Sequence, residues 1–208
     1  MKLEQPHYRR NLPHFLPDDA PYFVTFRLAG SIPESLMKQL HFERERELHL
    51  IEKLGNVNEE LHRKTQKRYF AKYDRLLDHP KNGPHWLRDE AVAKCIQHNI
   101  HRLEETNYTV WAYTIMSNHV HVLFTLDRST KKLHEVMQLL KGRSSIECNR
   151  ILGRSGSFWQ GESYDHVVRE NEFGRIVQYI LLNPVKAGLV ARWQDWPWTY
   201  LHPSIFGF

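Results

Sequence analysis

Residues 108–126 read YTVWAYTIMSNHVHVLFTL, and this stretch decides the fold class of the 208-residue chain. Both halves are rich in β-branched and aromatic residues, which favour extended strands. The polar pair Ser117-Asn118 separates them as a two-residue turn. We therefore predict a β-hairpin whose strands span 108–116 and 119–126.

The second strand of this hairpin carries two histidines one residue apart. Side chains alternate along a strand, so His119 and His121 face one way while Val120, Val122 and Phe124 face the core. Two adjacent imidazoles suit a divalent metal ion with one side open to solvent. The chain has 14 histidines, so two exposed histidines on a half-solvated strand are the alternative, which the motif alone does not exclude.

Further elements on either side of the hairpin complete the fold prediction. In chain order they are a strand over 22–28, a helical segment over about 33–77, a helix over 89–104 capped by Asp89, a helix over 131–152, a strand over 157–169 and a helix over 172–182. The helical segment is densely charged with both signs, as in a solvated helical hairpin, and we treat it as an insertion. The remaining order, βαββαβ, predicts an α+β, ferredoxin-like antiparallel sheet with helices on one face, followed by a C-terminal helix.

The length predicts one domain over 1–208. Residues 1–20 form an irregular basic arm that includes Arg9 and Arg10. The helical insertion follows the first strand, and a tail over 190–208 carries three tryptophans that we expect to pack over the core.

Composition excludes several classes of protein. Cys95 and Cys148 form no CxxC pair, so neither a zinc knuckle nor a disulfide framework is indicated. The N-terminus has no apolar signal-peptide core, and no apolar run is long enough to span a bilayer, so we expect a soluble cytoplasmic protein without a membrane partner. The formal net charge of +5 is only a weak indication of nucleic-acid binding.

A second motif lies near the C-terminus, where residues 178–188 read QYILLNPVKAG. Tyr179 and Asn183 are four residues apart, so they share one face of a helix, on the shoulder of its apolar stripe. Pro184 removes a backbone donor and disfavours helical geometry before it, so we predict that the helix ends at Asn183. A hydrogen-bonded interfacial tyrosine and a helix-terminal asparagine are the alternatives.

Basic residues gather in and around the helix predicted over 131–152. They are Lys132, Lys141, Arg143, Arg150 and Arg154. Together with Arg9 and Arg10 in the arm, they are candidate DNA-binding residues because cations at helical spacing can follow a line of phosphates. An ordinary solvated helix face is the alternative.

Taken together, these segments resemble the single-tyrosine HUH transposases, and most closely the REP-associated tyrosine transposases of bacteria. The resemblance covers nearly the whole chain. It is carried by residues 10–15 (RNLPHF), 20–28 (APYFVTFRL), 72–74 (KYD), 83–87 (GPHWL), 116–121 (MSNHVH), 158–160 (FWQ), 163–166 (SYDH) and 179–188 (YILLNPVKAG). Each piece is moderately specific, whereas their order and spacing together are highly specific.

The resemblance implies a catalytic site. His119 and His121 would be the HUH ligands of a Mg²⁺ or Mn²⁺ ion, and Tyr179 the nucleophile. Asn183 matches the polar residue that completes the metal site, although relatives outside the REP-associated group often have glutamine there. The implied reaction is nicking and strand transfer of single-stranded DNA through a 5′-phosphotyrosine.

The resemblance also implies the partner and the setting. Family members act on imperfect palindromes that fold into hairpins, so the expected partner is single-stranded, hairpin-forming DNA at chromosomal repeats of a bacterial nucleoid. The expected active form is a monomer or a homodimer. An alternative function is a DNA-binding protein of the same fold with little catalysis, and the HUH and tyrosine segments disfavour a third, an RNA-binding module.

Overall fold

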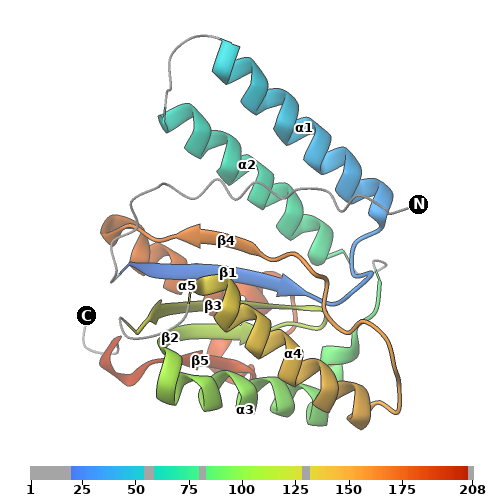
Figure 1. Ribbon diagram of the computed structural model, residues 1–208. Helices are drawn as coiled ribbons and strands as arrows, with labels where there is room; N and C mark the ends of the chain where they lie inside the picture. Colours follow the sequence, from blue (N-terminus) through green and yellow to red (C-terminus); the bar gives the residue numbers. More distant parts are fainter. Residues whose placement is uncertain (1–19, 54–58, 80–82, 128–131, 206–208) are drawn as a thin grey trace.

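The computed structural model describes residues 20–53, 59–79, 83–127 and 132–205 (Figure 1). The basic arm up to residue 19, including Arg9 and Arg10, therefore lies outside the described residues. No helix of the described part is long and apolar enough to cross a membrane.

Five antiparallel strands form one sheet in the order β4-β1-β3-β2-β5. Their bounds are β1 Pro21–Arg27, β2 Tyr108–Ile115, β3 His119–Leu126, β4 Tyr164–Val167 and β5 Thr199–Leu201. The first four have the order of a ferredoxin-like sheet, so the predicted α+β fold class is confirmed. The tail was expected to pack over the core, and it also adds β5 to the β2 edge.

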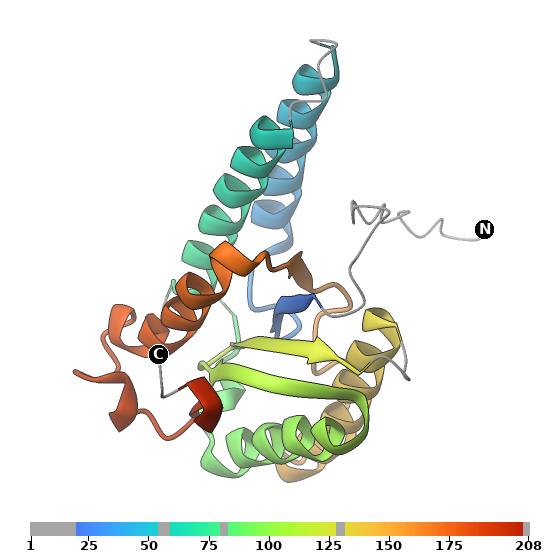
Figure 2. The ribbon, with the colours of Figure 1, turned by 90° about the vertical axis from the view of Figure 1, so that its left-hand side faces the viewer.

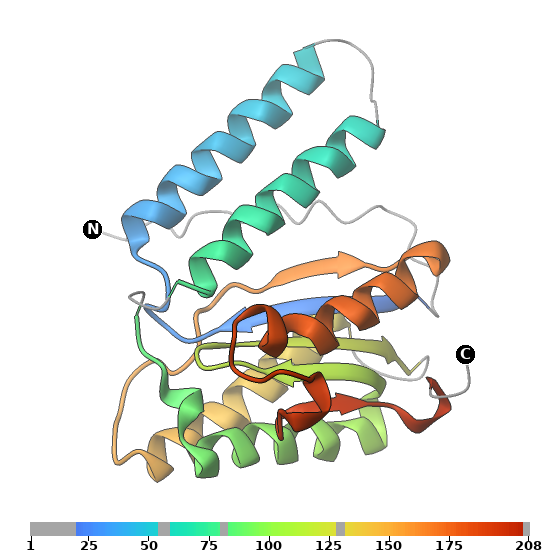
Figure 3. The same cartoon turned by 180° about the vertical axis from the view of Figure 1, so that it is seen from behind.

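The helices are distributed over both faces of the sheet. Their bounds are α1 Glu34–Lys53, α2 Glu59–Leu77, α3 Glu90–Asn107, α4 Leu133–Ile151 and α5 Phe173–Lys186. Helices α3 and α4 cover one face, as the ferredoxin-like pattern predicts, and α5 covers the other (Figures 2 and 3). Helices α1 and α2 run side by side and project from the sheet as a helical arm, which is distinct from the basic arm at the N-terminus (Figure 1).

Strand alternation sorts the side chains between two apolar clusters. On β3, Val120, Val122 and Phe124 belong to the large core under α3 and α4. Leu123 belongs to the smaller core under α5. Since side chains two residues apart share a face, His119 and His121 lie on the α5 side, and the predicted partition of this strand is confirmed.

The β2–β3 hairpin has the predicted two-residue turn, closed by a hydrogen bond from Met116 N to His119 O. Neither turn residue has a positive φ, so the turn is not one of the primed types usual in hairpins. Tertiary bonds hold it instead, because Asn118 O accepts from Leu28 N and Ser117 O accepts from Leu87 N.

Two predicted boundaries were wrong. The strand expected over 157–169 pairs regularly only from Tyr164, because residues 160–163 bulge away from β1 between the Leu28–Trp159 bridge and the Thr25–Tyr164 pair. Helix α5 continues through Pro184 to Lys186. A proline in the last turn removes one backbone donor there, and later bonds such as Ala187 N to Asn183 O close the helix.

Candidate active site

The two histidines of β3 converge on one point. Their Nε2 atoms are 3.0 Å apart, and the side chains are 1% and 0% exposed. The alternative of two solvated histidines is therefore wrong. Burial, and then the neighbouring His121, hold the pKa of His119 well below its usual range. The ring is thus neutral, the form in which imidazole binds metal ions.

Polar neighbours on the far side of each ring fix its orientation. His119 Nδ1 lies 2.7 Å from Asn118 Oδ1, and His121 Nδ1 lies 2.7 Å from Thr25 Oγ1. Asn118 Nδ2 in turn donates to Leu77 O at the end of α2. Because Asn118 Oδ1 can only accept, His119 carries its proton on Nδ1 and presents a free Nε2 lone pair.

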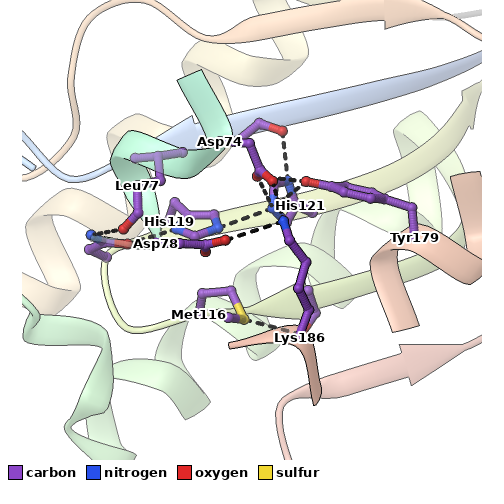
Figure 4. Close-up of polar contacts among 11 residues, drawn as sticks. Asp74, Leu77, Asp78, Met116, His119, His121, Tyr179 and Lys186 are labelled. Carbon is purple, nitrogen blue, oxygen red and sulfur yellow. Dashed lines mark hydrogen bonds and ion pairs between the residues drawn. The ribbon is translucent and has the colours of Figure 1, made fainter. Parts of the chain in front are cut away.

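Asp74, on α2 of the helical arm, brings a carboxylate to the histidine pair. One ligand atom each from Asp74, His119 and His121 lie within 4.8 Å of one another (Figure 4). Asp74 Oδ1 lies 3.5 Å from His121 Nε2. A carboxylate oxygen and two imidazole nitrogens form a donor set that suits a divalent cation.

Lys186 on α5 binds the second oxygen of this carboxylate. Its Nζ donates to Asp74 Oδ2 at 2.8 Å and to Asp78 Oδ2 at 3.3 Å. Burial by itself raises the pKa of Asp74, but His121, Lys186 and Tyr179 outweigh it and hold that pKa well below its usual range. Asp74 is therefore a buried carboxylate that remains ionised.

Tyr179 points its hydroxyl into the same cluster (Figure 4). The hydroxyl donates to Asp74 Oδ1 at 2.6 Å and lies 3.4 Å from His121 Nε2. The rings of Phe23 and Phe70 contact the tyrosine ring edge-on, each with centroids 5.8 Å away. Burial, and then the Asp74 carboxylate, raise the pKa of Tyr179 well above its ordinary value, so the phenol is protonated and held in one place.

Asn183 lies one turn after Tyr179 and is 1% exposed. Among the described residues, neither polar atom of its side chain has a hydrogen-bond partner, although the amide is near enough to the Tyr179 hydroxyl to lower the pKa of that phenol. A buried amide without partners costs free energy unless a further ligand satisfies it. Asn183 therefore fits a site that also holds a group from outside the chain.

The predicted DNA-binding residues of α4 are not brought to this cluster, because α4 covers the opposite face of the sheet. Lys132, Arg143 and Arg150 are exposed. Arg154 stacks its guanidinium 3.7 Å over the Trp86 ring and donates to Asn149 and Ser157. Lys141 donates to Gly161 O at 2.7 Å and to Ser163 Oγ at 3.3 Å.

Comparison with known proteins places this cluster in a family. A family model described as "Transposase IS200 like" matches residues 58–182, more than half of the chain. The chain belongs to the IS200-like transposase family. The matched segment of this IS200-like transposase contains Asp74, His119, His121 and Tyr179 and ends just before Asn183.

Curated relatives bear out the expected resemblance. A putative REP-associated tyrosine transposase of Haemophilus influenzae is 28% identical over 104 residues, which are 45% of this chain and 59% of the relative. A REP-associated tyrosine transposase of Escherichia coli K12 is 24% identical over 99 residues, 47% of this chain and 57% of the relative. The chain thus spans less than two thirds of the length of either relative.

A solved structure supports the fold. It is a REP-associated tyrosine transposase bound to a REP hairpin, with a TM-score of 0.58, 16% identity, and coverage of 98% of this chain and 87% of the other. At that identity the likeness concerns the arrangement of the elements alone.

Sequence reasoning did not assign a role to Asp74 or Lys186. Both lie in segments that carry the family resemblance, KYD and NPVKAG. For Asp74, the available signal was an acidic residue within a segment rich in aromatic residues. Its contact with His121 spans 47 positions along the chain. No local pattern predicts how α2 docks, so this contact could not be read from the sequence.

Proposed function

We propose that this IS200-like transposase nicks and rejoins single-stranded DNA through a 5′-phosphotyrosine at Tyr179. The observation that carries the proposal is the Tyr179 hydroxyl held 2.6 Å from Asp74 beside two buried histidines. A hydroxyl nucleophile, a proton acceptor and a set of metal ligands then share one site, as covalent catalysis at phosphorus requires.

In the proposed reaction, Tyr179 Oη attacks the phosphorus in line with the bond to the 3′-oxygen. The new P–O bond forms as the P–O3′ bond breaks, leaving a 5′-phosphotyrosine on one strand end and a 3′-hydroxyl on the other. The phenolic proton leaves to solvent past its hydrogen-bond acceptor Asp74 Oδ1, and the 3′-oxygen gains one from solvent. An incoming 3′-hydroxyl reverses these steps and joins strands without ATP.

The proposed metal ligands are His119, His121 and Asp74, with the Asn183 amide oxygen as a fourth donor. When bound, Mg²⁺ or Mn²⁺ would supply positive charge that stabilises the oxygens of the phosphate and makes the phenol more acidic. The chain's own contribution is to exclude water and to aim Asp74, His119 and His121 at one point. Thr25 and Asn118 hold the two imidazoles in that orientation.

The proposed substrate is a palindromic repeat that folds into a hairpin next to a single-stranded segment. The likeness to REP-associated relatives supports this choice. We propose that the exposed Lys132, Arg143 and Arg150, together with Arg9 and Arg10, hold DNA away from the reacting phosphate. Arg154 contributes less because its guanidinium already bonds within the chain.

The test is formation of a covalent adduct. The purified protein is incubated with single-stranded hairpin DNA and Mg²⁺ or Mn²⁺, and protein–DNA species that resist SDS are counted. We expect an adduct with the wild type and none with Tyr179→Phe or His119→Ala. Tyr200→Phe in β5 is the matched control and should retain the adduct. An adduct that persists in Tyr179→Phe would contradict the assignment of the nucleophile.

The second candidate is a DNA-binding protein of this fold with little catalysis. No specific observation favours it, because Asp74, His119 and His121 are buried around one point and the half-buried Tyr179 donates to Asp74. It predicts hairpin binding without an adduct under all metal conditions, so the same experiment distinguishes the two.

A further inference from the structure

Arg27 at the end of β1 is a buried cation beside the histidine pair. It pairs in register with His119 on β3, so the two side chains are neighbours on the same face of the sheet. The residue is 5% exposed. The arginine thus lies next to the proposed metal ligands, although the reaction described above does not use it.

The guanidinium has only neutral partners among the described residues. Its Nη1 donates to Ser31 Oγ at 3.2 Å, and its charge, together with a hydrogen bond, acts on the Tyr73 hydroxyl. No carboxylate among the described residues forms an ion pair with Arg27, although the charge of Glu162 acts on its neighbours Tyr73 and Lys141. A buried charge without a counterion is costly, which indicates that an anion completes this site.

A second cation approaches from the other side of the sheet edge. Residues 160–163 bulge opposite Phe26 and Arg27, and Lys141 donates to Gly161 O and Ser163 Oγ in this bulge. Burial, and then the nearby Arg27, lower the pKa of Lys141 to about 8. Lys141 also lines a groove of about 420 Å³ between α4 and the bulge. Glu162 and Asp165 line the same groove and Arg27 does not, so the candidate anion site lies beside the groove, at Arg27.

The position of Arg27 relative to Tyr179 suggests which anion it takes. Tyr179 Oη lies beside His121 at 3.4 Å, whereas Arg27 is paired with His119, two residues along β3. In-line displacement places the nucleophile and the leaving oxygen on opposite sides of the phosphorus. Arg27 is therefore on the side of the leaving strand.

We propose that Arg27, assisted by Lys141, binds a backbone phosphate of the single strand that leaves with the 3′-hydroxyl, next to the cleaved linkage. The planar guanidinium suits two parallel hydrogen bonds to phosphate oxygens. Arg27 then positions the strand for attack by Tyr179. This inference rests on the proposed function for the direction of the strand.

The first experiment measures DNA binding without cleavage. The probe is a labelled imperfect-palindrome hairpin with a 5′ single-stranded extension, titrated in EDTA at several salt concentrations. Arg27→Gln should bind about tenfold more weakly. The slope of log K against log salt should fall by about 0.7, the value for one single-strand phosphate contact. The control, Arg192→Gln, removes an exposed arginine held by Asp195 and should bind as the wild type.

The second experiment locates the phosphate by comparing wild-type protein with Arg27→Gln. Single methylphosphonate linkages, which lack the negative charge, are placed in turn along the extension. One linkage near the cleavage point should cost the wild type about tenfold in affinity, but less than about twofold in Arg27→Gln. If Arg27→Gln does not fold, Arg27→Met takes its place, because methionine also removes both the charge and the paired hydrogen bonds.

Two outcomes would overturn the proposal. One is a variant that folds as the wild type and keeps both its affinity and its salt slope. The other is a methylphosphonate scan in which no linkage depends on residue 27. Adduct formation is scored separately. If the wild type forms the adduct but no linkage depends on residue 27, only the role of Arg27 is contradicted. If one linkage depends on residue 27 but no adduct forms, only the proposed cleavage is contradicted.

Discussion

At the scale of single residues, the site depends on groups whose partners are far apart in the sequence. The pairing of His119 with His121 follows from strand alternation and could be predicted. The placing of Tyr179 one turn before Asn183 follows from helix periodicity in the same way. The Tyr179–Asp74 bond spans 105 positions and depends on how α2 and α5 pack, which no local pattern encodes.

Asp74→Asn tests the third metal ligand. The amide keeps the shape of the side chain but removes its charge, so the affinity for Mn²⁺ measured by calorimetry should fall by about 100-fold. Asp78→Asn is the matched control, because Asp78 contacts Lys186 without joining the cluster. Equal Mn²⁺ affinities for the two variants would remove Asp74 from the ligand set.

Thr25→Val tests the orientation of His121. Valine has nearly the same shape and removes only the hydroxyl that lies 2.7 Å from Nδ1. Loss of such a supporting contact typically weakens metal binding by about 10–100-fold, and we expect a value in that range. Thr125→Val, on the same strand as His121, removes a hydroxyl that accepts from Trp111 Nε1, and it should leave the Mn²⁺ affinity within about twofold of the wild type.

At the scale of elements, the sequence predicted which segments are helices and strands better than where they end. The Asp89 cap of α3 is present, with its carboxylate accepting from Ala91 N and Val92 N. The last turn of α5 tolerates Pro184 because the later bonds form without its donor. Only pairing with a distant strand reveals the bulge over 160–163, so a local pattern could not show it.

Glu172 joins α2 of the helical arm to β4 and α5. Its carboxylate contacts Lys67 of α2, His166 of β4 and Arg175 of α5 at 3.1 to 3.2 Å. Although burial by itself raises the pKa of Glu172, His166 and Lys67 lower it to about 2. The helical arm is thus attached to the sheet through a carboxylate that remains ionised in moderate acid.

This contact predicts a dependence of stability on pH. Because the pKa of Glu172 is about 2 in the folded chain and ordinarily 4.5, the stabilisation is full above about pH 4.5 and is lost as the pH falls toward 2. Its size is on the order of 1–2 kcal/mol, allowing for the exposure of Lys67 and Arg175. Urea unfolding of the wild type and Glu172→Gln at several pH values measures it. A constant difference between the two proteins from pH 6 to pH 2 would contradict the account.

At the scale of the whole molecule, the reacting groups come from α2, β3 and α5 of one chain. The tail covers one edge of the sheet, since β5 pairs with β2 and Trp196 Nε1 donates to Ile115 O. A second copy therefore could not pair along β2 without displacing β5. The two options left by the sequence, monomer or homodimer, thus become a proposal for a monomer acting alone.

Mixing two inactive variants tests this proposal. Tyr179→Phe and His119→Ala each lack one part of the site, so their mixture should remain without adduct if each chain carries a complete site. Light scattering should give a mass near 24.9 kDa for the wild type. Restored adduct formation in the mixture would instead require helices exchanged between two chains.

The most direct test of the central claim is to identify the residue that carries the DNA. After reaction with hairpin DNA and Mn²⁺, the adduct is digested with nuclease and trypsin and sequenced by mass spectrometry. Tryptic cleavage releases residues 176–186, IVQYILLNPVK, in which Tyr179 is the only tyrosine. We predict a nucleotide attached through phosphate to Tyr179 in this peptide. A nucleotide on another residue, or an unmodified peptide recovered from a confirmed adduct, would contradict the account.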